Sequence, residues 1–573
     1  MRLLVASLIT AAAVTPTPPT SSMDLRTYGA RCDGSTDDAA ALVAAVQAAR
    51  EKGATLEVTC RVRIVSGSLS VGVPMRFRDR GAFELAGGAL TIAGRFVAQK
   101  SQIFYTSGGQ LTIASPGVTL IPQWFGAVAD GRHDDRRAFQ DTTSALPEKG
   151  GTISLPAGRY RFSCSGATLA TPTIGFNITK PNARILGRDA TIVMDDFTRD
   201  SANAIEDRYG ADICTVIAFQ KTRGGRVEGL RFEGLGDRVA LINLRSRAKG
   251  IGITDSKDIT VVGVSGYGLV GNVVNARGTA AVDSTANVTV TDSYAERSSE
   301  NGFNYMGGTS HMVLTNTVSR DNGFHGAEFG SHYITVTNCV FTGNKTGISQ
   351  VGRYGTFTNN ILSNNRLEGF NFQWNDSRAY DGSYNKLSRN MIVGNGAIGV
   401  GASSNTHDNE ISDNVILNNG DQKQGGEGIK LATGCHDYAI YRNWIGNGPS
   451  GTAYTRYGIN IVATNRVKIS GNDFVDLGKW SVVTQGSSSD IEIASNRSNS
   501  QYSVASVSNS KVSNSDTPPA GSEAHVKSAV HPPECDSTTV GKLWTPQLPV
   551  GTRSGIDMCA KGHNDTYQWQ RLQ

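Results

Sequence analysis

The chain has few charged and few aromatic residues for its length of 573. Charged residues make up 18% and aromatic residues 7%, which excludes an acidic disordered chain and a coiled coil. The net charge of +5 is too small to argue for nucleic acid as a partner. The nine histidines are sparse and the eight cysteines contain no CxxC pair. We therefore expect no zinc or other metal site and no cofactor.

Long apolar runs are missing after residue 22. Residues 3–14 are mostly apolar, follow Arg2 and precede a proline-rich stretch. This pattern is typical of a secretory signal peptide. A phage-type anchoring peptide, or a true start at Met23, would account for the same residues. The run is too short to span a bilayer as a helix, and we predict no membrane span elsewhere in the chain.

The chain does have a short repeat between residues 293 and 496. Residues 357–365, 387–395 and 411–419 are three versions of it. Apolar and polar residues alternate within each version, which is the period of a strand and not of a helix. A small polar residue recurs at intervals of 21 to 30 residues, at Ser293, Thr317, Cys339, Asn360, Asn390, Asn414, Asn443, Asn472 and Asn496.

Such a period indicates a solenoid, in which no single repeat buries its own apolar face. Three short strands per turn, bent at Asn and Gly, account for ~22 residues per rung. An Asn at the bend tolerates left-handed backbone geometry, and its amide can bond the same amide one rung above. We predict an all-β, right-handed parallel β-helix with an N-terminal capping helix and a small C-terminal β module. The longer intervals place inserted loops at residues 373–386, 421–427 and 448–457, where binding residues tend to concentrate.

One strand of each rung follows a repeated Gly and predicts two faces. The first residue after each Gly should point inward: Phe303, Ala327, Ile348, Phe370, Val400, Ile429 and Ile459. The next residue should point outward: Asn304, Glu328, Ser349, Asn371, Gly401, Lys430 and Asn460. Because polyols need many neutral donors and acceptors, this row is a candidate sugar-binding face.

Glu328 is the carboxylate of that row, and acidic residues and a histidine flank it. The predicted catalytic residues are Glu328, Asp376, Asp321, Glu300 and His325. The predicted substrate-binding residues are Asn304, Asn371, Gln373, Trp374, Arg378, Tyr380, Asp381 and Arg353. Two carboxylates suit a glycoside hydrolase.

Each of these residues also has a simpler structural interpretation. Glu328 would then be a solubilising charge and Asp321 a turn residue. Arg378 would pair with Asp376 or Asp381 only to hold the loop. A polysaccharide lyase would instead use His325 or Tyr305 with Arg353 or Lys345, although Tyr305 should face inward.

Two segments before the repeat are related to each other. Residues 28–41 and 124–139 each carry an Asp-Gly turn and then an Asp pair, Asp37-Asp38 and Asp134-Asp135. Together with residues 150–160, they resemble the opening of the pectate-lyase-like right-handed β-helix superfamily, which includes many phage tailspike depolymerases. The resemblance covers residues 24–515 and implies that the four Asp residues are helix caps, or else calcium ligands. The calcium triad and catalytic Arg of typical pectate lyases cannot be matched here.

The remaining expectations concern domains and cysteines. We expect a signal or anchor at 1–22, a first β-helix segment at 23–121, the main β-helix at 122–515 and a C-terminal module at 516–573. Cys535 and Cys559 bracket that module and are the most plausible disulfide, with Cys32–Cys60 as a weaker second candidate. The rung spacing excludes a Cys339–Cys435 bond.

The C-terminal module resembles those that end phage tail proteins, which implies a homotrimer, with a monomeric carbohydrate-binding appendage as the alternative. Three functions stay open. The chain is a tailspike-like depolymerase of a bacterial surface polysaccharide on a phage tail or baseplate, a secreted polysaccharide hydrolase or lyase, or a trimeric fibre that only attaches to glycans. All three place it outside the cell.

Overall fold

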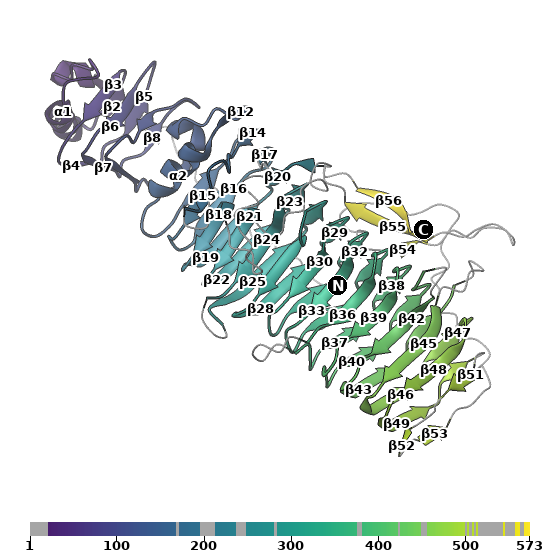
Figure 1. Ribbon diagram of the computed structural model, residues 1–573. Coiled ribbons are helices and arrows are strands. Elements are labelled where there is room, and N and C mark those ends of the chain that lie inside the picture. The colour runs from purple at the N-terminus through teal and green to yellow at the C-terminus, as the bar shows by residue number, and fades with distance from the viewer. Residues whose placement is uncertain are drawn as a thin grey trace, which may run out of the picture. The chain divides into compact units, whose positions relative to one another are not determined.

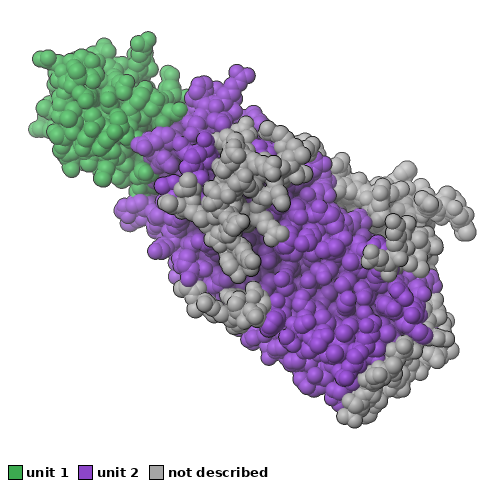
Figure 2. Space-filling model, viewed as in Figure 1, with its two compact units in different colours: residues 1–118, 123–126, 144–147 green, residues 119–122, 127–143, 148–573 purple. Residues whose placement is uncertain are grey.

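The computed structural model describes residues 21–167, 171–194, 213–236, 248–279, 283–374, 381–421, 425–448 and 455–498, and the backbone of short strands between Gln501 and Leu572. The chain divides into two compact units, which Figure 2 shows in green and purple. The first comprises residues 1–118, 123–126 and 144–147, and the second comprises the rest. Within the described residues, no helix is long and apolar enough to cross a membrane.

The first unit is a short stack of parallel strands with a helix. Its helical elements are η1 (Leu25–Tyr28) and α1 (Ala39–Lys52). One sheet contains β1 (Ser22–Asp24), β2 (Thr55–Val58), β5 (Met75–Phe77) and β8 (Phe96–Val97). The second contains β3 (Arg61–Ile64), β6 (Ala82–Leu85) and β9 (Phe104–Tyr105), and the third β4 (Ser68–Val71), β7 (Ala89–Ile92) and β10 (Gln110–Ile113).

The second unit repeats the same plan over many more rungs (Figure 1). Its α-helix is α2 (Arg136–Ser144), whereas η2 (Pro122–Phe125) belongs mostly to the first unit. The 16-stranded sheet contains β11 (Thr119–Leu120), β13 (Thr152–Ser154), β16 (Ala183–Leu186), β19 (Arg223–Glu228), β22 (Lys257–Val262), β25 (Thr285–Thr291), β28 (Thr309–Thr315), β31 (Thr335–Thr337), β34 (Thr356–Thr358), β37 (Lys386–Ser388), β40 (Glu410–Ser412), β43 (His436–Tyr441), β46 (Asn465–Ser470), β49 (Ser488–Ala494), β52 (Val507–Ser508) and β53 (Lys511–Ser513).

Two further sheets complete each rung. The 14-stranded sheet contains β12 (Asp130–Asp134), β14 (Gly158–Arg161), β17 (Ala190–Val193), β20 (Arg231–Glu233), β23 (Ser265–Tyr267), β26 (Tyr294–Glu296), β29 (Val318–Arg320), β32 (Val340–Thr342), β35 (Ile361–Ser363), β38 (Met391–Val393), β41 (Val415–Leu417), β44 (Trp444–Gly446), β47 (Asp473–Val475) and β50 (Arg497–Ser498). The 13-stranded sheet contains β15 (Thr173–Ile178), β18 (Cys214–Gln220), β21 (Ala248–Thr254), β24 (Gly271–Arg277), β27 (Phe303–Met306), β30 (His325–Phe329), β33 (Thr346–Gln350), β36 (Glu368–Phe372), β39 (Ile398–Ala402), β42 (Gly426–Leu431), β45 (Thr455–Val462), β48 (Trp480–Gln485) and β51 (Gln501–Ser503).

The order of strands confirms the predicted parallel β-helix. Neighbours in each long sheet are one rung apart in sequence and run parallel, and Val, Ile, Leu and Phe fill the interior. The capping helix is α1. The C-terminal β module is an antiparallel sheet of β54 (Leu543–Trp544), β55 (Ile556–Lys561) and β56 (Tyr567–Leu572).

Buried asparagines stack along the bend before the 14-stranded sheet. The Oδ1 of Asn390 accepts the Asn360 backbone N–H at 2.9 Å and the Asn360 side-chain amide at 3.0 Å. Its own Nδ2 donates to the carbonyl of Phe357 at 2.9 Å. The same pattern continues through Asn414, Asn443, Asn472 and Asn496. The predicted amide stack is therefore confirmed.

The left-handed backbone lies one residue before each stacked Asn. Asn359, Arg389 and Asp413 have φ of 57°, 56° and 58°. The prediction that the stacked Asn itself takes this conformation is wrong, because its side chain must turn inward to reach the next rung. The residue before it makes the turn and stays at the surface.

In both Asp pairs, the first and the second Asp make different hydrogen bonds. The first Asp of each pair caps the helix, since Ala39 N–H donates to Asp37 at 3.1 Å and Arg136 N–H to Asp134 at 3.1 Å. The second Asp is buried and accepts backbone N–H groups of the preceding loop instead. Asp38 accepts from Arg31, and Asp135 accepts from Val128 and Ala129. The cap prediction is right for the first Asp and wrong for the second.

The cysteines also differ in part from expectation. Cys32–Cys60 forms a disulfide, and so does Cys164–Cys214, which the sequence did not suggest. Cys339 and Cys435 are free and buried. Cys535 and the side chain of Cys559 lie outside the described residues, so that pairing stays a prediction.

Replacing Asn390 by Ala should test how much the stack contributes to stability. The change leaves two buried donors of Asn360 and the Phe357 carbonyl without their partner, each worth about 1–3 kcal/mol. We expect the urea midpoint to fall clearly, by an equivalent of roughly 3 kcal/mol or more. Asn177→Ala, at an exposed position of β15, should change it little. Equal midpoints for the two variants would contradict the role of the stack.

The buried carboxyl of Asp135 should make stability depend on pH. Burial raises its pKa to about 6, against the hydrogen bonds that lower it. The folded state therefore holds this proton more tightly than the unfolded chain, so the free energy of unfolding should fall as pH rises from about 4 to about 6. Urea unfolding across this range should show a smaller fall for Asp135→Asn than for the wild type. An equal fall of the free energy of unfolding in Asp135→Asn and in the wild type would contradict a raised pKa of Asp135.

Candidate functional site

The predicted outward row exists in the register of the 13-stranded sheet. The Cα partners run from Asn304 to Glu328, Ser349, Asn371, Gly401, Lys430 and Asn460. We call this set the Glu328 row. The residues before them, from Phe303 to Ile459, are 0% exposed in the core. The inward and outward assignments are confirmed.

A second outward row lies three residues earlier on the same strands. It contains the residue before each repeated Gly, namely Asn301 (just before β27), His325, Thr346, Glu368, Ile398, Glu427 and Tyr457, and it continues on β48 with Trp480, which precedes Ser481. We call this set the His325 row. The reason is that each Gly also faces the core, where a Cβ on Gly326 would lie 2.8 Å from the Phe341 ring. Strict alternation starts only after the Gly, so a pattern of period two does not predict this row.

Glu328 lies where the two rows approach each other. Asn301 Nδ2 donates to its Oε2 at 2.8 Å. Burial raises the pKa of the Glu328 carboxyl, and the hydrogen bond from Asn301 offsets only part of that effect. A solubilising surface charge would keep an ordinary pKa. The burial of Glu328 and its hydrogen bond to Asn301 do not fit a freely solvated surface charge.

Two neighbours of Glu328 have polar atoms without a partner among the described residues. These are Asn304 Oδ1 and His325 Nδ1, both on side chains that are 8% exposed. Burial, together with the charge of Lys345, lowers the pKa of His325 to about 3, so its imidazole is neutral at neutral pH. Buried polar atoms without partners are uncommon and mark places where another molecule can supply the hydrogen bond.

Glu368 is a second half-buried carboxyl that the sequence did not reveal. Its Oε2 accepts from Asn371 Nδ2 at 2.9 Å and lies 3.5 Å from Thr346 Oγ1. Burial raises its pKa, while these hydrogen bonds and the nearby charges of Lys345 and Lys430 lower it. Its signal in the sequence is its place directly before the repeated Gly. Asn371, a predicted binding residue, thus contacts the second carboxyl.

Asp381, at the described end of the loop after β36, forms an ion pair. Arg353 donates to both oxygens of Asp381 at 2.9 and 2.6 Å. Burial alone would raise the pKa of Asp381. The bonds from Arg353 outweigh this effect and hold the pKa below its ordinary value. Arg353 is thus the partner of Asp381, and the pair holds the loop.

The rest of that loop is described only in part. Gln373 accepts from Ser349 Oγ at 2.6 Å, which ties the loop to the Glu328 row, and Trp374 is 38% exposed. Asp376, Arg378 and Tyr380 lie outside the described residues, so their roles stay predictions.

Three other predicted residues are placed elsewhere. Asp321 has a φ of 55° and a half-exposed side chain at the bend after β29, as expected of a turn residue. Glu300 is buried directly before Asn301. Tyr305 is 0% exposed in the core, as expected, which removes it as a base for a lyase.

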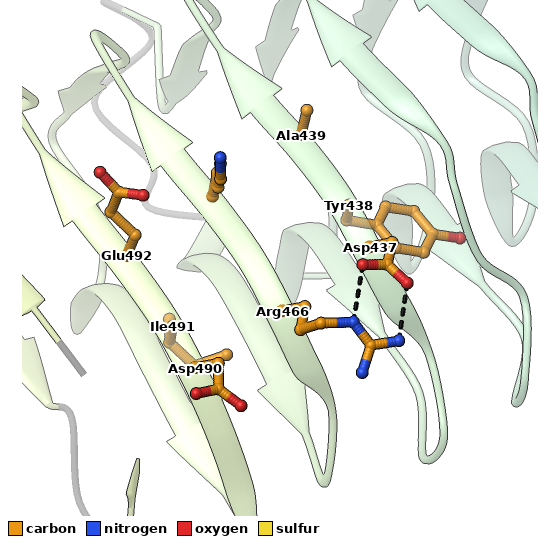
Figure 3. A pocket seen from close by; sticks show the side chains of 8 residues that line it. Asp437, Tyr438, Ala439, Arg466, Asp490, Ile491 and Glu492 are labelled. Atoms are coloured by element: carbon orange, nitrogen blue, oxygen red, sulfur yellow. Dashed lines mark hydrogen bonds and ion pairs between the residues drawn. The ribbon is translucent and has the colours of Figure 1, made fainter. Parts of the chain in front are cut away.

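A shallow cavity lies on the 16-stranded sheet, away from both rows (Figure 3). Asp437, Arg466, Asp490 and Glu492 line it, and Arg466 donates to both oxygens of Asp437 at 2.8 and 2.7 Å. The Arg466 contact, first among several causes, lowers the pKa of Asp437 to about 2. A carboxylate held ionised by a bidentate Arg neither donates nor accepts a proton readily, so this cavity is a poorer catalytic site than the two rows.

A model of the right-handed β-helix region matches residues 249–445 and 320–498, which include both rows. The second unit has the right-handed parallel β-helix fold. This agrees with the parallel sheets and with the resemblance seen in the sequence.

The relatives of this β-helix protein are distant. The curated mannuronan C5-epimerase AlgE1 of Azotobacter vinelandii is 28% identical over 240 residues, or 40% of this chain and 15% of that protein. The solved A-module of mannuronan C-5 epimerase AlgE4 of the same organism is 19% identical, with a TM-score of 0.44 over 70% of this chain and 100% of the module. Tailspike protein 3 of bacteriophage CBA120 is 13% identical, with a TM-score of 0.40 over 79% and 68%. The chain spans only 13–26% of the length of the curated relatives it matches.

Proposed function

We propose that this β-helix protein binds a polysaccharide along the Glu328 and His325 rows and cleaves it, with Glu328 as the proton donor. The observation that carries the proposal is the carboxyl of Glu328, whose pKa burial raises and whose described partner is a neutral amide. A general acid needs a pKa near the working pH, which this environment favours. The amides around it suit the hydroxyl groups of sugars.

The two carboxyl groups differ in a way that assigns their roles. Positive charges of Lys345 and Lys430 act on Glu368, whereas no cation in the described part of the chain contributes to the pKa of Glu328. Glu328 is therefore the one that stays protonated, and Glu368 the one that ionises first. Protonated Glu328 donates to the oxygen of the glycosidic bond as that bond breaks. Ionised Glu368, two rungs away, takes a proton from the attacking water.

A second candidate is chemistry at a uronic acid, either epimerisation or elimination. The observation that favours it is the match to curated mannuronan C5-epimerases. Here the neutral imidazole of His325 would remove the proton next to the carboxylate, and Lys345 would hold that carboxylate. The third possibility, attachment without chemistry, requires the same rows only as a binding surface.

The partner and the setting belong to the same proposal. We infer a bacterial surface polysaccharide as the substrate and an extracellular location, on a phage tail or as a secreted protein. A homotrimer stays a prediction, since the connecting segment and the side chains of the C-terminal module lie outside the described residues.

Glu328→Gln should lower the rate of polysaccharide cleavage by a factor of about 10² or more, because the amide cannot donate the proton. The assay follows new reducing ends, absorbance of unsaturated products, and deuterium uptake from D₂O in a panel of capsular and exopolysaccharides. Glu492→Gln, at an exposed carboxylate of the 16-stranded sheet, is the matched control and should keep full activity.

The product identifies the reaction. Reducing ends without unsaturation mean hydrolysis, unsaturated ends mean elimination, and deuterium uptake without shorter chains means epimerisation. Full activity of Glu328→Gln contradicts the assigned acid. Binding without any product supports the attachment fibre instead.

The alkaline limb of the pH–rate profile should report Glu328. The protonated form is the active one, so kcat/KM should be high below the raised pKa of Glu328 and fall as pH increases through it. Glu368→Gln should lower the rate and remove the acidic limb but keep the alkaline one. An alkaline limb that is unchanged in Glu328→Gln would contradict the assignment.

A further inference from the structure

The His325 row changes character toward the C-terminal end of the 13-stranded sheet. After Glu368 it continues through Ile398 and Glu427 to Tyr457 and Trp480, which pair directly on β45 and β48. The hydrogen-bonding groups around Glu328 thus give way to two aromatic rings on adjacent rungs. Both rings are on the outer face, because the next residue on each strand already faces the core: a Cβ on Gly458 would lie 2.6 Å from the Phe474 ring, and Ser481 is 0% exposed.

The two rings have no role in the core and each has a cation close by. Tyr457 and Trp480 are half-buried. The Arg456 guanidinium lies 5.1 Å from the Tyr457 ring centroid, and the Lys479 ammonium 5.8 Å from that of Trp480. Aromatic rings with polar groups at their edges are the common lining of sites for ligands that have both apolar and polar faces. A pyranose ring is such a ligand.

Asn460 places a hydrogen-bond acceptor beside the rings. It is 3% exposed and lies three residues after Tyr457 on the same strand. Its Nδ2 donates to Glu427 Oε1 at 3.1 Å, and its Oδ1 has no partner among the described residues. A buried acceptor without a donor costs about 1–3 kcal/mol, which a hydroxyl donor recovers. Glu427 Oε1 also lies 3.6 Å from Lys430 Nζ, so its charge is balanced.

Gly401 keeps the surface open between these rings and Glu368. A Cβ at this position would lie 3.1 Å from Glu368 Oε1 and 3.6 Å from its Cδ. Since every other member of the Glu328 row has a side chain, the row projects least from the sheet at Gly401. A chain bound at Glu368 can therefore pass over β39 toward Tyr457.

We propose that Tyr457, Trp480 and Asn460 form a second sugar-binding subsite for another pyranose unit of the same polysaccharide. It lies three to four rungs from Glu368, or ~14–19 Å at the strand spacing. This inference rests on the proposed function and deepens it, because it places the substrate along the stacking direction of the rungs. The subsite binds sugar and takes no part in the chemistry.

The test measures binding by the full-length protein at two probe lengths. The probes are disaccharides and hexasaccharides of one neutral series, cello-oligosaccharides, and one acidic series, oligomannuronates. Isothermal titration gives affinity, and tryptophan fluorescence reports contact with the ring of Trp480. We expect Trp480→Ala to weaken hexasaccharide binding about tenfold or more, as expected for loss of a stacked ring, and to leave disaccharide binding nearly unchanged. Trp480→Phe should recover most of the loss.

Controls separate this inference from the proposed function. Trp444→Ala changes a half-buried Trp on the 14-stranded sheet and should keep full affinity, and the melting temperatures of all variants are compared. Loss of activity in Glu328→Gln with unchanged binding in Trp480→Ala overturns the subsite alone. Retained activity in Glu328→Gln with weakened binding in Trp480→Ala overturns the acid alone. No binding of any probe by the wild type also overturns the subsite.

Discussion

The buried amide-to-backbone contact between successive rungs is the constraint on which the second unit depends. Parallel strands by themselves permit a slip of register, which would move every side chain to the other face. A stacked Asn prevents this, because its Oδ1 must meet the backbone N–H of one particular residue on the neighbouring rung. The stack therefore fixes which outward residues are neighbours. In this register Glu328 lies beside Asn304 and Ser349.

This constraint explains how much the sequence predicts. The stacked residues recur in the sequence, so their spacing gives the fold, the rungs and the members of the Glu328 row. Glu368 was not predicted, because each Gly before the inward residue also faces the core and breaks the alternation. The backbone conformation at one Gly per rung thus decides whether an alternating pattern in the sequence can predict that Glu368 faces outward.

Burial and pairing are the properties that the sequence could not supply. An outward residue of a strand is expected to be exposed, yet Asn304 is 8% and Ser349 0% exposed. The pKa of Glu328 follows from this burial, not from its position in a pattern. Asp38 and Asp135 resemble their preceding Asp residues in sequence but turn the other way, because the loops before them present free N–H groups. Local residue types do not specify such long-range partners.

The contrast between paired and unpaired carboxyl groups gives the proposal its physical basis. Around the outer faces, Asp413 bonds Arg442 and Asp381 bonds Arg353, and the pKa of both Asp residues is lowered. Such an Arg keeps its carboxylate partner ionised. No cation among the described residues contributes to the pKa of Glu328, so the low dielectric around it favours the protonated acid. A carboxyl that served stability alone would gain from an Arg in the next rung, as Asp413 does. Its isolation among amides has a cost in the free protein, and a bound sugar that accepts its proton would offset that cost.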